Sequence, residues 1–172
     1  MKYLTERVET EPSRLLLEYW GTLPREKGIP AKADLDVVQM PRPLLPHLFL
    51  LEFDYSPFRA VFRLQGTFMT NSLGQSFTGK EIANGLLGHE TDRVLQQMER
   101  LASSQVPYIT KECLVSETGV KLAIEVVHLP LLDEEGKTSH LIGSLTPVQG
   151  NPSRFDDLTY SYWAVTDICE IT

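Results

Sequence analysis

Cysteine is scarce in this sequence of 172 residues, which contains only Cys113 and Cys169. The two lie far apart and belong to no Cys-x-x-Cys or mixed Cys/His pattern, so nothing indicates a disulfide framework or a structural zinc site. We therefore expect two reduced thiols. Two histidines on predicted neighbouring strands, His128 and His140, could share a face, but two ligands without a third are too few for a metal centre.

Basic residues are outnumbered, with 16 Lys and Arg against 23 Asp and Glu and a formal net charge of −7. Because an acidic surface repels phosphate backbones and no run of basic residues occurs, we expect no direct nucleic-acid partner. Long apolar runs are also missing. The longest, LFLL at 48–51, is far too short to span a membrane, and residues 1–10 lack the apolar segment of a secretory signal. We expect a cytoplasmic protein that does not bind membranes.

Motifs of catalysis are missing as well. The sequence has no Gly-x-Ser-x-Gly, no phosphate loop and no dinucleotide fingerprint. Asp34 and Asp36 form a pair of carboxylates, but they lie in a proline-rich segment, where an aspartate more commonly caps a turn than transfers protons. Nothing here predicts an enzyme.

Hydrophobic periodicity indicates two helices and several short helical pieces. Apolar residues recur at helical spacing in 12–23 and again in 89–105, while glycines break 66–87 into short turns. The segment 28–46 carries four prolines and is predicted to be a connector. The helix over 12–23 is too apolar to stay in solvent, so it packs either on its own domain or in a dimer contact.

Strand signals define five segments, two before the helical stretch and three after it. Alternating apolar residues between turn residues mark strands at 48–54, 58–65, 108–115, 120–132 and 139–148. This order predicts an α+β domain: a five-stranded antiparallel sheet with helices on one face and an N-terminal flanking helix. We divide the chain into the N-terminal helix and proline-rich connector (1–46), the core (47–148) and an aromatic tail (149–172) that docks on the sheet or on a partner.

The topology and three local motifs resemble a family of short stand-alone bacterial PAS proteins. The motifs are DLD at 34–36 followed by PxxLLPHLFL at 41–50, FRLQGT at 62–67, and GxxxTGK at 74–80. The resemblance covers about residues 10–148, with Val37 standing where a proline is expected. It implies a PAS-like fold and roles in ligand sensing, dimerisation or docking to a signalling partner, and it supplies no catalytic residues.

In a PAS domain the ligand lies in a cup between the sheet and the helical insert. Strand and helix periodicity predict that ten apolar side chains line this cup, or else fill it as an ordinary core: Phe62, Leu64, Leu122, Ile124, Val126, Phe68, Leu73, Ile82, Leu86 and Met98. Arg63 stands beside them as a possible anchor for a carboxylate or phosphate of the ligand. The alternative for Arg63 is an ion pair with Asp54, Glu112 or Asp36.

No cofactor is expected in this cup. A haem would need a helical histidine facing it, for which His89 is the only candidate by position. A flavin photoadduct would need a cysteine in the helical insert, whereas Cys113 falls on a strand and Cys169 in the tail.

Three functions fit the sequence unequally. The first is a non-enzymatic sensory module that binds a small molecule and changes the packing of its N-terminal helix or tail. The second is a constitutive protein–protein adaptor with a filled core and exposed anchors at Trp20, Tyr162 and Trp163. The third, a small cup-shaped isomerase or dehydratase, needs an acid or histidine base inside the cup, and no convincing pair stands out. With no attached kinase, cyclase or DNA-binding segment, we expect a homodimer that acts through a signalling partner protein.

Overall fold

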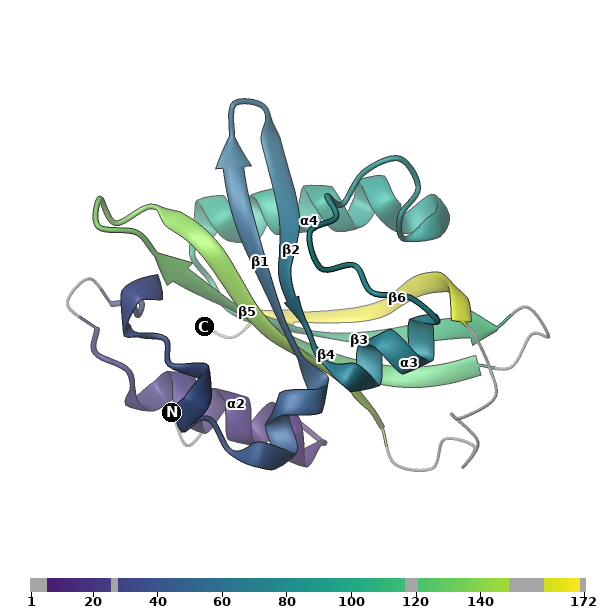
Figure 1. Cartoon of the computed structure of the whole chain (residues 1–172), viewed down its shortest axis with the longest axis horizontal. Helices are drawn as coiled ribbons and strands as arrows, with labels where there is room; N and C mark the ends of the chain where they lie inside the picture. Colours follow the sequence, from purple (N-terminus) through teal and green to yellow (C-terminus); the bar gives the residue numbers. More distant parts are fainter. Residues whose placement is uncertain (1–5, 26–27, 117–120, 149–159, 171–172) are drawn as a thin grey trace.

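The computed structural model describes residues 6–25, 28–116, 121–148 and 160–170 (Figure 1); the side chains of 89, 115–116 and 160–170 are not described. One antiparallel sheet runs through the molecule in the order β2-β1-β5-β4-β3-β6. Its strands are β1 (Leu48–Tyr55), β2 (Phe58–Gln65), β3 (Tyr108–Ser116), β4 (Lys121–Leu132), β5 (Thr138–Pro147) and β6 (Tyr160–Glu170). The predicted five-stranded sheet is confirmed, and the segment predicted as a docking tail adds β6 beside β3.

In the described parts of the chain, three α-helices and four 3-10 turns accompany the sheet. The helices are α2 (Glu11–Thr22), α3 (Thr67–Leu73) and α4 (Thr91–Ser104). Pro12 stands in the first turn of α2, where its missing N–H costs no hydrogen bond. The 3-10 turns are η1 (Lys32–Asp34), η2 (Val37–Gln39), η3 (Arg42–His47) and η4 (Gly88–Glu90).

The sheet has a core on each face, because successive strand side chains point to opposite sides. In β1, Phe49 and Leu51 belong to a core that α3 and α4 cover, whereas Leu48 and Leu50 belong to a second core that α2 covers. Figure 1 shows α2 and α4 on opposite sides of the sheet. The side covered by α3 and α4 holds the cup; we call the other side the outer face.

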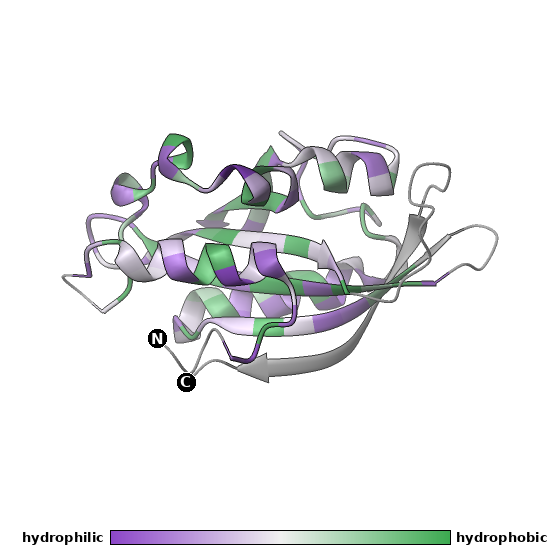
Figure 2. Ribbon diagram, turned by 90° about the horizontal axis from the view of Figure 1, so that it is seen from below, coloured by the Kyte–Doolittle hydropathy of each residue, from purple (hydrophilic) through white to green (hydrophobic). Residues whose placement is uncertain are grey.

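The N-terminal helix packs on its own domain, which is one of the two alternatives that the sequence left open. Leu16, Leu17 and Trp20 are buried against the outer face, and the indole Nε1 of Trp20 donates to the Pro130 carbonyl at 3.2 Å. Along the helices, Figure 2 shows bands of hydrophobic and hydrophilic residues, as expected where only one side is buried. Trp20 is only 3% exposed, so the prediction that it is an exposed interface anchor is wrong.

Two of the family-like motifs meet at the entrance to β1. A Cβ atom on Gly66 would lie 2.1 Å from the carbonyl oxygen of Pro46, so only glycine fits there. The Gly66 N–H also donates to the Leu48 carbonyl at 2.7 Å. In the DLD motif, Asp36 caps η2 by accepting from the Val38 N–H at 2.9 Å, which is the turn-capping role the sequence favours. These motif residues therefore position the chain.

The free edge of β2 is covered by the segment that follows α3. The Gly79 N–H donates to the Phe62 carbonyl at 2.7 Å, the Phe62 N–H donates to Lys80 at 3.0 Å, and Ile82 donates to Ala60 at 2.8 Å. This cover satisfies backbone groups that an open edge would leave free for pairing with another chain. Within the described parts of the chain, none of the helices has the length and apolar character to cross a bilayer.

Candidate functional site

A small apolar cavity lies in the cup, between the sheet and the helical layer. Its volume is about 20 Å³, room for about one water molecule. The side chains that line it are mostly apolar, with one acid and one histidine among them: Phe49, Leu51, Phe62, Met69, Ile82, Leu87, Val94, Gln97, Met98, Glu112, Val126 and His128.

The structure places most of the predicted cup residues on this side of the sheet. Four of them line the cavity: Phe62, Ile82, Met98 and Val126. Five others pack in the same core without lining the cavity: Phe68, Leu73, Leu86, Leu122 and Ile124. The cup is therefore largely filled by its own side chains.

Leu64 and Arg63 do not face the cup, and a β-bulge is the reason. The register between β1 and β2 shifts so that Leu50 pairs with Leu64 but Leu51 pairs with Phe62, leaving Arg63 as the extra residue. Leu64 consequently packs against the outer-face core. Arg63 forms an ion pair with Glu52 on the surface, where half of its side chain is exposed. The anchor role for Arg63 is wrong, and its ion-pair partner is Glu52, not one of the three acids that the sequence suggested.

Glu112 is the acid in the cup. One carboxyl oxygen, Oε1, takes a hydrogen bond from the Thr110 hydroxyl, while Oε2 is buried without a hydrogen-bond partner. Burial raises the pKa of Glu112 to about 8, although Thr110 and the positive charge of Arg93 act to lower it. At neutral pH this side chain is mainly a neutral carboxylic acid.

His128 is the second polar group that lines the cup. Its ring stacks on Tyr108, with the ring centroids 4.3 Å apart, and its Nδ1 is buried without a hydrogen-bond partner. Burial lowers the pKa of His128 to about 3, so the imidazole is neutral. His140 pairs with Leu131, which faces the outer side, so the two histidines point to opposite faces and the expectation that they share a face is wrong.

Sequence reasoning missed Glu112 and His128 as cup residues, although the signal was present in β3. Tyr108, Thr110, Glu112 and Leu114 alternate along that strand, and Tyr108 and Leu114 are apolar enough to mark this as the core side. Strand alternation therefore places Glu112 on the buried face. In β4 the same rule places His128 with Ile124 and Val126.

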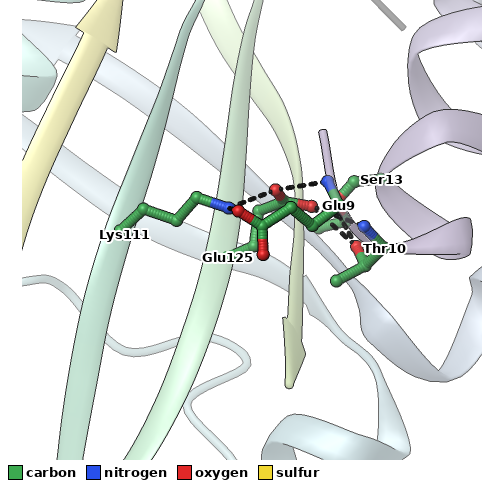
Figure 3. Close-up of polar contacts among 6 residues, drawn as sticks. Glu9, Thr10, Ser13, Lys111 and Glu125 are labelled. Atoms are coloured by element: carbon green, nitrogen blue, oxygen red, sulfur yellow. Dashed lines mark hydrogen bonds and ion pairs between the residues drawn. The ribbon is translucent and has the colours of Figure 1, made fainter. Parts of the chain in front are cut away.

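A polar cluster, shown in Figure 3, ties the N-terminal segment to the outer face. The fully buried carboxylate of Glu125 accepts hydrogen bonds from the Glu9 N–H at 2.8 Å and from the N–H and hydroxyl of Thr10 at 3.1 and 2.8 Å. The ammonium of Lys111 lies 2.8 Å from the same carboxylate and 3.0 Å from the exposed carboxylate of Glu9. We call Glu125, Lys111 and Thr10 the latch.

The latch holds its two charged groups ionised. Burial acts to raise the pKa of Glu125, but the Lys111 ammonium and the N–H and O–H donors outweigh it and the pKa is lowered. Burial acts to lower the pKa of Lys111, but the bonds and charges of Glu125 and Glu9 raise it. Glu125 thus binds the two backbone N–H groups that immediately precede α2, whose N-cap Thr10 makes no side-chain capping bond.

Strand β3 connects the cup and the latch. Thr110 and Glu112 point into the cup, and Lys111 between them points to the outer face and reaches Glu125. The cup acid and the lysine of the latch are therefore adjacent residues of one strand.

Several other predictions fall elsewhere. Asp34 is exposed. Cys113 is a free, half-buried thiol on β3, and the described residues contain no group of three or more potential metal ligands. The side chains of His89, Tyr162, Trp163 and Cys169 lie outside the described residues, so the haem and tail-anchor predictions are not tested.

Comparison with solved structures finds only distant similarity at low sequence identity. The Ile74Val variant of Vivid superposes with a TM-score of 0.47 at 10% identity, covering 81% of this chain and 94% of that one. For the VqmA dimer of Vibrio cholerae the TM-score is 0.46 at 15% identity, covering 62% of this chain and 49% of that one. For the light-state LOV domain of Aureochrome1 the values are 0.44 and 11%, covering 62% and 84%.

The alignment with VqmA bound to DPO spans 53% of that chain, about half of its length. No curated protein matches in sequence. The family described as "PAS domain" matches residues 8–146, which include the latch, the cup and all three motifs that resemble PAS proteins. This match covers most of the chain and agrees with the observed sheet and helices, so the chain belongs to the PAS-domain family.

Proposed function

We propose that this chain is a non-enzymatic PAS sensory module that holds a small molecule in its cup and signals through the N-terminal segment to a partner or a second copy. The PAS fold supports a sensory or signalling module, although a fold alone does not define a ligand. The observation that carries the proposal is the alternation in β3: Glu112 offers an unpartnered oxygen to the cup, and its neighbour Lys111 holds the latch.

In this proposal the signal is a change in populations. Two states of the domain differ in how firmly α2 packs on the outer face. A ligand that hydrogen-bonds to Glu112 binds one of these states more tightly. To shift the equilibrium, such a ligand has to offset the free energy that is lost when the latch opens.

The described lining of the cup favours binding over catalysis. His128, with a pKa of about 3, is too weak a base to abstract a proton from a carbon acid, and Glu112 is the only other ionisable side chain among the described residues that line the cavity. An isomerase or dehydratase would need a second effective acid or base beside Glu112.

The test compares the mass of the purified chain under native and denaturing conditions, together with hydrogen exchange of α2. Extra mass seen only in the native spectrum, and faster or slower exchange in Glu11–Thr22 after its removal, are expected for a sensor. A retained molecule whose removal leaves α2 unchanged would contradict the signalling route through the latch.

A second candidate is an adaptor that binds a partner constitutively. The observation that favours it is the small cavity, since about 20 Å³ leaves no space for a metabolite unless side chains move. In that case the native spectrum shows no extra mass, and variants of the cup leave partner binding unchanged while variants of the surface abolish it.

A further inference from the structure

The cup contains an acid, Glu112, that forms no ion pair with a described residue of the cavity wall. Among the described residues that line the cavity there is no lysine and no arginine. Arg93 of α4 acts on Glu112 through its charge, but its guanidinium is engaged in an ion pair with Glu90. Thr110 occupies only Oε1, so Oε2 remains a buried polar atom without a hydrogen-bond partner, on a side chain that lines a mostly apolar cavity.

Building on the sensory function above, we propose that the cup binds a small apolar molecule carrying a basic nitrogen, an amine or a nitrogen heterocycle, which pairs with Oε2 of Glu112. Both protonation states of the pair lead to the same contact. A neutral acid donates its proton in an O–H···N bond, and an ionised carboxylate accepts one in an N⁺–H···O⁻ bond. A buried polar atom without a partner has much to gain from either.

Ligands with a carboxylate or phosphate do not fit this site. Such a group would bury a negative charge with no arginine or lysine among the described residues of the cavity wall to compensate it, and it would oppose the ionisation of Glu112. Purely apolar ligands would leave Oε2 as it is and gain only the contacts with the walls. The nitrogen is therefore what distinguishes the proposed class.

His128 provides a second polar contact in the same cavity. Its neutral imidazole stacks on Tyr108, and its buried Nδ1 has no hydrogen-bond partner. A ligand with a second N–H or O–H, as in an aminoheterocycle, can use it. His128 cannot itself replace the nitrogen base, because burial keeps its pKa at about 3 and so too low for an ion pair with Glu112.

Adaptable side chains allow the cup to accept more than a water molecule. Met69 and Met98 line it from α3 and α4, and both are unbranched thioethers that repack with little cost. Gln97 of α4 also lines the cavity and is only partly buried. A ring-sized ligand is therefore expected to displace these side chains first.

The experiment compares three probes of one shape: benzylamine, ethylbenzene and benzoate. Each is titrated into the wild-type chain and into Glu112→Gln, which keeps the size of the side chain but neither ionises nor carries a carboxylic proton. Binding is read as the increase in Tm and as shifts of the methionine methyl resonances. Thr110→Val, which frees Oε1 but leaves Glu112 in place, is the second variant.

We expect benzylamine to bind the wild type at least about tenfold more tightly than ethylbenzene, a difference of about 1.4 kcal/mol. Glu112→Gln removes this preference and leaves ethylbenzene binding unchanged, which shows that the cup is intact. Thr110→Val reduces the preference, because the carboxylate loses a donor. Affinity for benzylamine in the wild type rises between about pH 6 and about pH 8, as ionising Glu112 becomes easier.

Two results would overturn the inference in different ways. If benzylamine and ethylbenzene bind equally in both proteins, or benzoate binds best, the cup takes ligands but the nitrogen class is wrong, and the sensory function stands. If no probe binds, and the native spectrum shows no retained mass, both the ligand class and the sensory function fail and the adaptor is favoured.

Discussion

At the scale of the residue, burial determines the protonation state of Glu112. A glutamate in the unfolded chain titrates near 4.5, whereas burial raises the pKa of Glu112 to about 8 in the folded domain. Between these two values the folded state binds one proton more than the unfolded state, so folding stability decreases as the pH rises. Above pH 8 the fold contains a buried carboxylate, at a cost on the order of 5 kcal/mol.

Replacing Glu112 with glutamine is expected to remove that pH dependence. The amide is neutral at every pH, so Glu112→Gln should lose little stability near pH 6 and exceed the wild type by a few kcal/mol near pH 9. Urea unfolding at about pH 6 and about pH 9 measures both values. The exposed variant Glu135→Gln is the control and should follow the wild type. A wild type as stable near pH 9 as near pH 6 would contradict the assignment.

At the scale of the element, close backbone approach fixes the start of β1. Gly66 has room for no Cβ atom, because the carbonyl of Pro46 occupies its place. Gly79 differs: its φ of +83° favours glycine, but nothing lies within 4 Å of the position of a Cβ atom. Gly66 and Gly79, two of the three glycines in the family-like motifs, therefore favour glycine for different physical reasons.

These reasons predict different costs for the same substitution. Gly66→Ala must move η3 and residue 66 apart and is expected to cost about 3 kcal/mol or more, whereas Gly79→Ala introduces only backbone strain of about 1 kcal/mol. Thermal and urea unfolding of both variants measure the difference. Equal costs would show that the contact with Pro46 is not what requires Gly66.

Hydrophobic periodicity predicts most helices and strands of this domain. It fails where strand pairing or register determines the position of a residue. The strands around 48–65 and 108–148 match because their alternation records which side is buried. The bulge at Arg63 leaves no mark in the sequence, so Leu64 was assigned to the wrong face. The strand β6 depends on its partner β3, and so the aromatic tail gave only a general docking prediction.

The residues of the candidate site also divide into those that periodicity predicts and those that it does not. The apolar wall, including Phe62, Ile82, Met98 and Val126, could be predicted from side-chain periodicity. The polar members could not be separated from surface residues by type alone, since a glutamate on a strand is usually exposed. Only a strict reading of the faces of β3 would have placed Glu112 inside.

At the scale of the whole molecule, two buried glutamates stand on opposite faces of the sheet and titrate in opposite directions. The pKa of Glu125 is lowered in the fold, so its contribution to stability is present above the ordinary pKa of a glutamate and is lost as the pH falls. The pKa of Glu112 is raised, and its penalty grows as the pH rises. Acid therefore loosens the latch and base destabilises the cup.

Removing the charge of the latch is expected to loosen α2 before the rest of the domain. Glu125→Gln removes the buried carboxylate that pairs with the partly buried Lys111 and should cost about 3 kcal/mol. Hydrogen exchange should become roughly tenfold to a hundredfold faster in Glu11–Thr22, while amides of β1 and β2 lose protection only as far as global stability falls. Glu135→Gln again serves as the matched control.

Acidification of the wild type should reproduce the same pattern, because it protonates Glu125. Below about pH 4 the exchange of α2 is expected to accelerate in the wild type and to change little in Glu125→Gln, which has no carboxylate left to titrate there. Such local opening would identify α2 as an element whose docking can be shifted without unfolding the cup. Uniform loss of protection across α2 and the central strands, in the variant or at low pH, would mean that the domain opens as one unit and that the latch cannot carry a signal.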